Sequence, residues 1–134
     1  MHTGKVPAWI LIGGFVLAAV AGLVNAIGLL GLQHPISHVT GNASLFATSL
    51  VRGDYGELRV TGLLAAMFLA GAVIGGFVIQ QSTARLGRRY GAALTIESAL
   101  LFAAAFYLGR GTDSGMYLAA VACGLQNALV TTYS

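Results

Sequence analysis

The fold is decided by an uncharged stretch of 46 residues, VPAWILIGGFVLAAVAGLVNAIGLLGLQHPISHVTGNASLFATSLV, which runs from Val6 to Val51. Across all 134 residues, 57% are hydrophobic and 8% are charged, whereas a soluble domain has about 25% charged residues. A soluble globule of this size has too little interior to hide so much apolar surface. The composition therefore predicts an integral membrane protein. It excludes a soluble enzyme, a disordered tail and a nucleic-acid-binding module.

Around this stretch, the chain has enough apolar sequence for several membrane crossings, each of which takes about 20 residues. We expect four spanning helices, at Ala8–Leu32, Val60–Gln80, Gly91–Gly109 and from Met116 to Ser134. The segment Ile36–Leu50 is also uncharged, but its 15 residues are rich in Ser, Thr and Asn, which favours a re-entrant or interfacial segment. The predicted fold is all-α: a polytopic transmembrane bundle with one short broken segment, forming a single integral-membrane domain over residues 1–134.

The basic residues suggest an orientation for this bundle. Seven basic and four acidic residues give a formal net charge of +3, and Arg85, Arg88 and Arg89 share one short loop after Gln80. A cluster of arginines between two apolar spans is typical of a cytoplasmic loop. We therefore expect this loop on the cytoplasmic side, together with Lys5.

Small residues recur every four positions in two of the expected spans. Membrane helices use such residues to bring their backbones together, so we interpret both series as packing faces, within one subunit or between the two subunits of a homodimer. The first series is Gly14, Ala18, Gly22 and Ala26, and the second includes Gly71 and Gly75.

A short motif occurs twice in the chain. Gly22-Leu23-x-Asn25-Ala26-Ile27 returns 102 residues later as Gly124-Leu125-x-Asn127-Ala128-Leu129. Transporter folds are often built from two repeats with the binding site at their interface. If Ile36–Leu50 does not span the membrane, the two copies run in opposite directions; if it does, they are parallel. The sequence thus resembles half of a two-repeat transporter fold, with the second repeat beginning near Gly124.

Glu97 is the only acidic residue inside an expected span. A charge at the centre of a membrane helix costs about 2.5–3.5 kcal/mol on insertion scales. We therefore expect Glu97 to face a cavity or a partner, or to be protonated. It is either a neutral group hydrogen-bonded to a neighbouring helix or a site for a proton or cation.

The segment His34-Pro35-Ile36-Ser37-His38-Val39-Thr40-Gly41-Asn42 predicts a break between helices, because Pro35 cannot continue an ordinary helix. If a helix resumes after it, Ser37, Thr40, Ser44 and Thr48 share one face. Such a hydroxyl-rich stripe suits the wall of a wet cavity. The alternative is that the hydroxyls bond back to carbonyl groups of their own helix.

Amide side chains are the other polar groups expected at membrane depth, and their default role is hydrogen bonding between helices. His34 and His38 have a metal-ligand spacing, but Pro35 separates them and no Cys or acid follows nearby, so we expect no metal. The candidate ligand-binding residues are Asn25, His38, Thr40, Gly41, Asn42, Glu97, Gln126 and Asn127.

No motif of familiar catalysis occurs in the sequence: there is no nucleophile elbow, no Gly-rich loop after a strand and no pair of neighbouring carboxylates in a span. We therefore predict no enzymatic activity and no cofactor. An intramembrane enzyme that pairs Glu97 with His38 is the remaining alternative. Cys123, the only cysteine, is expected to be a small buried side chain.

Three motifs occur in the order Gly22-x-x-Asn25-Ala26, Ser37-His38-x-Thr40-Gly41-Asn42 and Gly124-Leu125-Gln126-Asn127-Ala128. In this order, over the whole chain, they resemble the YoaK family of bacterial multi-pass membrane proteins. The resemblance implies a location in the inner (plasma) membrane. It also implies a longer protein, since family members continue past the equivalent of Ser134 through a second Thr-Gly motif. Many members carry Asp at the position of Asn25, and the family has no assigned activity.

Two functions fit these observations. The first is a permease for a small solute or ion, with its site at the Thr40-Gly41-Asn42 break. The second is a non-transporting scaffold or partner subunit that associates through its small-residue helix faces. In both, the lipid bilayer is the surrounding partner and no nucleic acid is bound; the sequence names no substrate.

Overall fold

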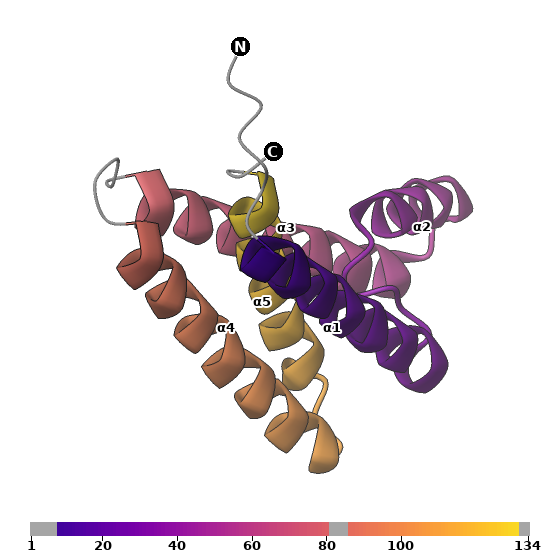
Figure 1. The fold of residues 1–134 in the computed structure, drawn as a ribbon. Coiled ribbons are helices and arrows are strands. Elements are labelled where there is room, and N and C mark those ends of the chain that lie inside the picture. Colours follow the sequence, from indigo (N-terminus) through magenta and orange to yellow (C-terminus); the bar gives the residue numbers. More distant parts are fainter. Residues whose placement is uncertain (1–7, 81–85, 132–134) are drawn as a thin grey trace.

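The protein is a bundle of helices in the computed structural model, which describes residues 8–80 and 86–131 (Figure 1). No strand occurs in these two ranges, so the all-α prediction is confirmed. Lys5 and Arg85, which contribute to the predicted orientation, lie outside the described residues. Within the described residues, the helices are α1 Ala8–Leu32, α2 Val39–Arg52, α3 Tyr55–Gln80, α4 Leu86–Gly109 and α5 Ser114–Thr131.

Three of the described helices are long and apolar enough to cross a membrane, at Leu11–Leu32, Tyr55–Val78 and Gly91–Gly109. They match three of the four predicted spans and make the chain a membrane protein. The fourth predicted span corresponds to α5, which has 18 residues, two of them amides, and is not among these three. The predicted short segment is α2, whose 14 residues reach about 21 Å, less than the roughly 30 Å of a bilayer core.

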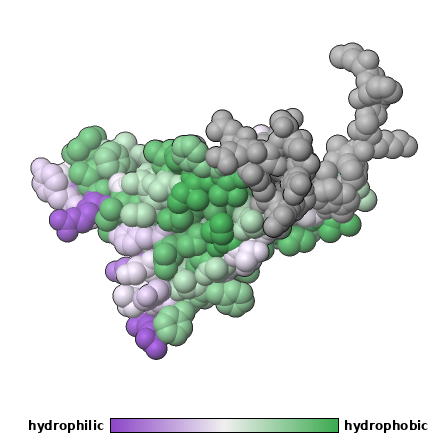
Figure 2. Space-filling model, turned by 90° about the vertical axis from the view of Figure 1, so that its left-hand side faces the viewer, coloured by the Kyte–Doolittle hydropathy of each residue, from purple (hydrophilic) through white to green (hydrophobic). Residues whose placement is uncertain are grey.

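Helix α5 forms the centre of the bundle, where α3 and α4 pack against it and α1 crosses it (Figure 1). Its buried side chains are Met116, Ala119, Ala120, Ala122, Cys123, Leu125, Gln126 and Leu129. The outer helices instead expose large apolar side chains, as expected of a surface that faces lipid. Figure 2 shows hydrophobic residues across the middle of one face and hydrophilic residues at its left-hand and lower edges.

Glycines bring α3 and α5 into backbone contact. A Cβ atom on Gly71 would meet the carbonyl group of Val121, and one on Gly124 would meet the carbonyl group of Phe68. Gly75 also lies against α5, because a Cβ atom on it would come within 2.8 Å of the Ala128 Cβ. The second small-residue series therefore lies at the α3–α5 contact.

The first small-residue series has a different setting. A Cβ atom on Gly14 or Gly22 would have no described atom within 4 Å. Ala18 and Ala26 are also exposed. This face of α1 is therefore open in the described part of the chain.

The connection from α1 to α2 follows the predicted break. Helix α1 ends at Leu32, and the chain turns at Gln33, which has a positive φ of 61°. Ile36 is buried (1% exposed) and lies over Gly28, where a Cβ atom would be only 2.6 Å from the Ile36 Cγ1. His34 Nε2 lies 3.0 Å from the Glu57 carboxylate in the first turn of α3. The break thus ties the end of α1 to the start of α3.

Where α1 meets α5, the two helices run in opposite directions. Leu17 of α1 contacts Gln126 of α5. One turn later on α1, Ala21 lines the same cavity as Cys123, which lies one turn earlier on α5. This is the direction that an inverted pair of the repeated motifs requires. The two-repeat architecture itself, with a second copy beginning near Gly124, stays a prediction.

The glycine contact makes a prediction about stability. Gly71→Val places a branched side chain against the backbone of α5, so we expect the free energy of unfolding to fall by about 1–3 kcal/mol or more. Thermal unfolding of the purified protein in detergent measures the change. The matched control is Gly76→Val in the same helix, because a Cβ atom at Gly76 meets nothing within 4 Å. Equal unfolding temperatures for the two variants would contradict the packing described here.

Candidate functional site

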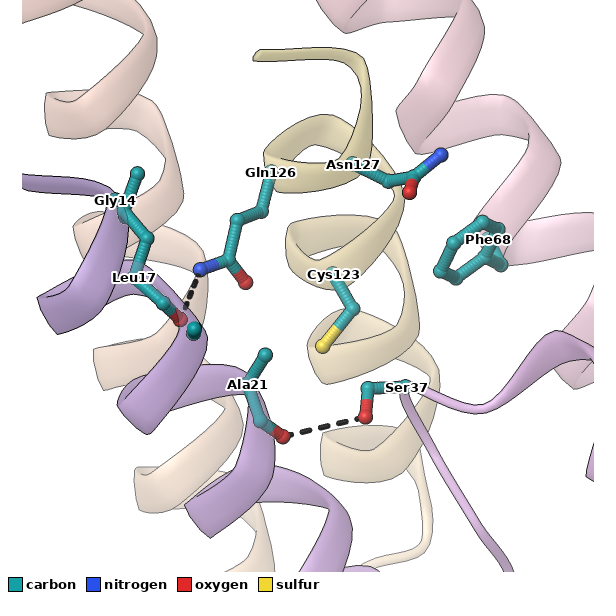
Figure 3. Close-up of a pocket in the computed structure, with 9 residues that line it drawn as sticks. Gly14, Leu17, Ala21, Ser37, Phe68, Cys123, Gln126 and Asn127 are labelled. Atoms are coloured by element: carbon teal, nitrogen blue, oxygen red, sulfur yellow. Dashed lines mark hydrogen bonds between the residues drawn. The ribbon is translucent and has the colours of Figure 1, made fainter. Parts of the chain in front are cut away.

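A cavity of about 240 Å³ lies between α1, α3, α5 and the break after α1 (Figure 3). Helix α5 contributes its polar wall and α3 contributes one aromatic ring. Its lining residues are Gly14, Leu17, Ala18, Ala21, Ser37, Phe68, Cys123, Gln126 and Asn127. Two of the predicted ligand-binding residues, Gln126 and Asn127, therefore line this cavity. Ser37, from the predicted hydroxyl stripe, lines it as well.

Two polar side chains hold α1 against this cavity. Gln126 Nε2 donates a hydrogen bond to the Leu17 carbonyl oxygen over 2.6 Å, and Ser37 Oγ donates to the Ala21 carbonyl oxygen over 3.2 Å (Figure 3). The two carbonyls are four residues apart, so they belong to consecutive turns on one side of α1. A buried amide without a hydrogen bond costs about 1–3 kcal/mol in proteins. The bond from Gln126, which is 5% exposed, therefore favours a docked α1.

The cavity offers polar groups but no formal charge. None of its lining residues is Asp, Glu, Lys or Arg. Gln126 and Asn127 can each donate and accept hydrogen bonds, and Phe68 supplies an apolar wall. The Asn127 side chain is exposed and forms no hydrogen bond with any described residue. This set of groups suits a small uncharged ligand that both donates and accepts hydrogen bonds.

The predicted residues of the helix break lie elsewhere. Asn42 is buried, and its Nδ2 donates a 2.6 Å hydrogen bond to the carbonyl oxygen of Pro35, so its amide stabilises the break itself. Gly41 packs against the ring of Pro35. His38 and Thr40 are exposed, with His38 Nδ1 3.2 Å from Thr40 Oγ1. None of these four residues lines the cavity.

The hydroxyl groups of α2 bond back to carbonyl groups of their own helix, which is the alternative interpretation of this stripe. Ser44 Oγ donates to the Thr40 carbonyl oxygen over 2.9 Å, and Thr48 Oγ1 donates to the Ser44 carbonyl oxygen over 2.6 Å. All three residues are exposed. Only Ser37, which precedes the helix, reaches the cavity.

Three buried polar atoms have no hydrogen-bond partner in the described part of the chain: Asn25 Oδ1, Asn42 Oδ1 and Glu97 Oε2. All three belong to predicted ligand-binding residues, but they lie on α1, α2 and α4, and none of these residues lines the cavity. Glu97 is 3% exposed.

The histidines do not form a pair. His34 contacts Glu57 and, through Nδ1, the Leu32 carbonyl oxygen at 2.6 Å, whereas His38 faces Thr40. Within residues 8–80 and 86–131, no group of three or more His, Cys, Asp or Glu side chains is placed to hold a metal ion.

Sequence reasoning did not anticipate the parts of the cavity that come from apolar residues. Cys123 and Phe68 gave no polar signal, and the Leu17 and Ala21 carbonyls have no sequence signature. One signal was present: Cys123 precedes Gln126 by three residues and Asn127 by four, which places all three on one face of a helix.

A family model described as "Protein of unknown function (DUF1275)" matches residues 13–134 of the chain. No curated protein and no solved structure matches it.

The hydrogen bond to α1 yields a prediction. Gln126→Leu keeps much of the side-chain volume but removes the donor to Leu17, so we expect the free energy of unfolding to fall by about 0.6 kcal/mol, and by at most roughly 1.7 kcal/mol. Faster hydrogen exchange in α1 should accompany it. Asn127→Leu is the control, because the Asn127 side chain has no hydrogen bond in the described structure. If α1 exchanges equally fast in wild type and Gln126→Leu, the amide does not hold the helix.

Proposed function

We propose that this chain, which belongs to the DUF1275 family of proteins of unknown function, is a membrane permease for a small uncharged polar solute. The observation that carries the proposal is that two amide side chains, Gln126 and Asn127, line a cavity in a bundle that contains membrane-spanning helices. The solute site proposed here is this cavity, rather than the Thr40-Gly41-Asn42 break, because none of those three residues lines the cavity.

The size and chemistry of the cavity support this class of solute. A volume of about 240 Å³ leaves room for several water molecules or one small solute. An ion that gave up its hydration there would find no countercharge among the lining residues, which costs several kcal/mol. An uncharged solute instead exchanges its hydrogen bonds with water for bonds with Asn127 and Gln126.

Several further assignments belong to the same proposal. The ordered motifs support placing the chain with the YoaK-like members of the family, in the inner membrane of a bacterium. We propose that it is not an enzyme, that it binds no nucleic acid, and that lipid surrounds it.

One observation favours a second candidate, a scaffold or partner subunit that associates through α1, for example as a homodimer. Gly14 and Gly22 leave the surface of α1 free of described neighbours within 4 Å. A face of small residues allows another helix to approach closely in a membrane. In this candidate, the open face of α1 is the working surface.

The permease proposal predicts that filling the cavity blocks transport. Ala18→Phe places a ring into the space beside Gln126, so solute entry should fall to the rate of protein-free vesicles. Entry is measured by the osmotic reswelling of proteoliposomes mixed with glycerol, urea or acetamide. Ala19→Phe, also on α1 but outside the cavity lining, should retain wild-type rates. Identical rates for wild type and empty vesicles with every solute would contradict the proposal.

The scaffold candidate makes a separate prediction. Gly22→Leu adds a large side chain to the open face of α1 and should abolish association in detergent, while Gly13→Leu, on the opposite side of α1 from Gly22, should leave it intact. Sedimentation equilibrium of the purified proteins gives the oligomeric state. A wild-type protein that is monomeric at every concentration would overturn this candidate.

A further inference from the structure

Glu97 lies in the seam between α4 and α5. Its exposed fraction is 3%, and it shares one face of α4 with Ala93 and Ala104, which are four residues before it and seven after it. Both alanines are buried; Ala93 clusters with Leu125 and Leu129 of α5, and the Ala104 carbonyl lies against Gly115. Glu97 therefore lies between two points at which α4 contacts α5. It is about 9 Å along the helix axis from Gly91, the first residue of the apolar span.

No countercharge accompanies Glu97 among the side chains that the structure describes. The sequences of α1 and of α3 from Val60 to Val78 contain no titratable residue, and α5 contains two, Cys123 and Tyr117. Among the described residues, Glu97 takes part in no ion pair and its Oε2 has no hydrogen-bond partner. An unpaired carboxylate in such a place is costly, whereas a neutral carboxylic acid costs much less to bury.

We infer that Glu97 is a proton-binding site and that the proposed permease moves its solute together with a proton. In the loaded state, the carboxyl group holds the proton as an O–H bond. In the released state, that bond breaks, the proton passes to water, and the electron pair stays on the carboxylate. The inference rests on the proposed function for its transport step, but not for the binding of the proton.

A proton fits this site better than a metal ion does. One oxygen atom suffices to bind a proton, whereas hard metal cations take several oxygen ligands. Within the described ranges, Glu97 belongs to no group of three or more potential metal ligands. The solute cavity is a separate place, since Glu97 is not among its lining residues.

Infrared spectroscopy tests the proton site directly, because the chain has only four acidic side chains, Asp54, Glu57, Glu97 and Asp113. In a detergent without ester groups at neutral pH, we expect one carbonyl band of a protonated carboxylic acid, shifted in D₂O. The isosteric variant Glu97→Gln should lose this band, and Asp113→Asn, at an exposed position, should keep it. A wild-type spectrum without the band, or a band retained in Glu97→Gln, would overturn the inference.

The coupling step has its own measurement. In proteoliposomes with an imposed proton gradient, wild type should accumulate a solute that it transports, whereas Glu97→Gln should carry it only to equal concentrations. Accumulation by Glu97→Gln equal to that of wild type would overturn the coupling. No transport by wild type in the presence of the infrared band would instead overturn the proposed function and the coupling, and leave the proton site standing.

Discussion

The backbone contact between α3 and α5 is the constraint on which the other helix positions depend. Gly71 and Gly124 allow each helix to approach the carbonyl groups of the other, and no side chain larger than hydrogen fits there without a shift. In lipid, helices gain little from hydrophobic association, so such close approach supplies much of their attraction. Because α5 is fixed in this way, its other faces are presented at set positions to α4 and α1.

The remaining faces of α5 differ in chemistry, and the proposed function follows from that difference. Helix α5 has small buried residues such as Ala122, and α4 packs alongside it. Towards α1, helix α5 presents the amides of Gln126 and Asn127, and a cavity lies between the helices there. The hydrogen bond from the Gln126 amide to the Leu17 carbonyl spans the cavity and holds α1 in place there. The resulting space is apolar at its walls and polar where α5 crosses it.

Much of the fold could be predicted from the sequence, because apolar length, charge placement and Pro35 act locally along the chain. The site could be predicted less well, because it depends on which helix each face meets. The two small-residue series repeat every four residues, yet only the glycines of the second series, Gly71 and Gly75, lie in close contact with α5. Asn42 and Asn127 are both amides in apolar helices, but the side chain of Asn42 donates to the Pro35 carbonyl, whereas that of Asn127 forms no hydrogen bond with a described residue.

The proposed permease requires that water and small solutes reach the space beside Asn127 within the membrane-embedded bundle. The most direct test is the reactivity of Asn127→Cys, in a Cys123→Ala background, with a charged, membrane-impermeant thiol reagent in intact membranes. The account predicts that this cysteine reacts readily and that Ala18→Phe slows the reaction, whereas Leu69→Cys on the apolar outer face of α3 stays inert. Equal inertness of the cysteines at positions 127 and 69 would contradict it.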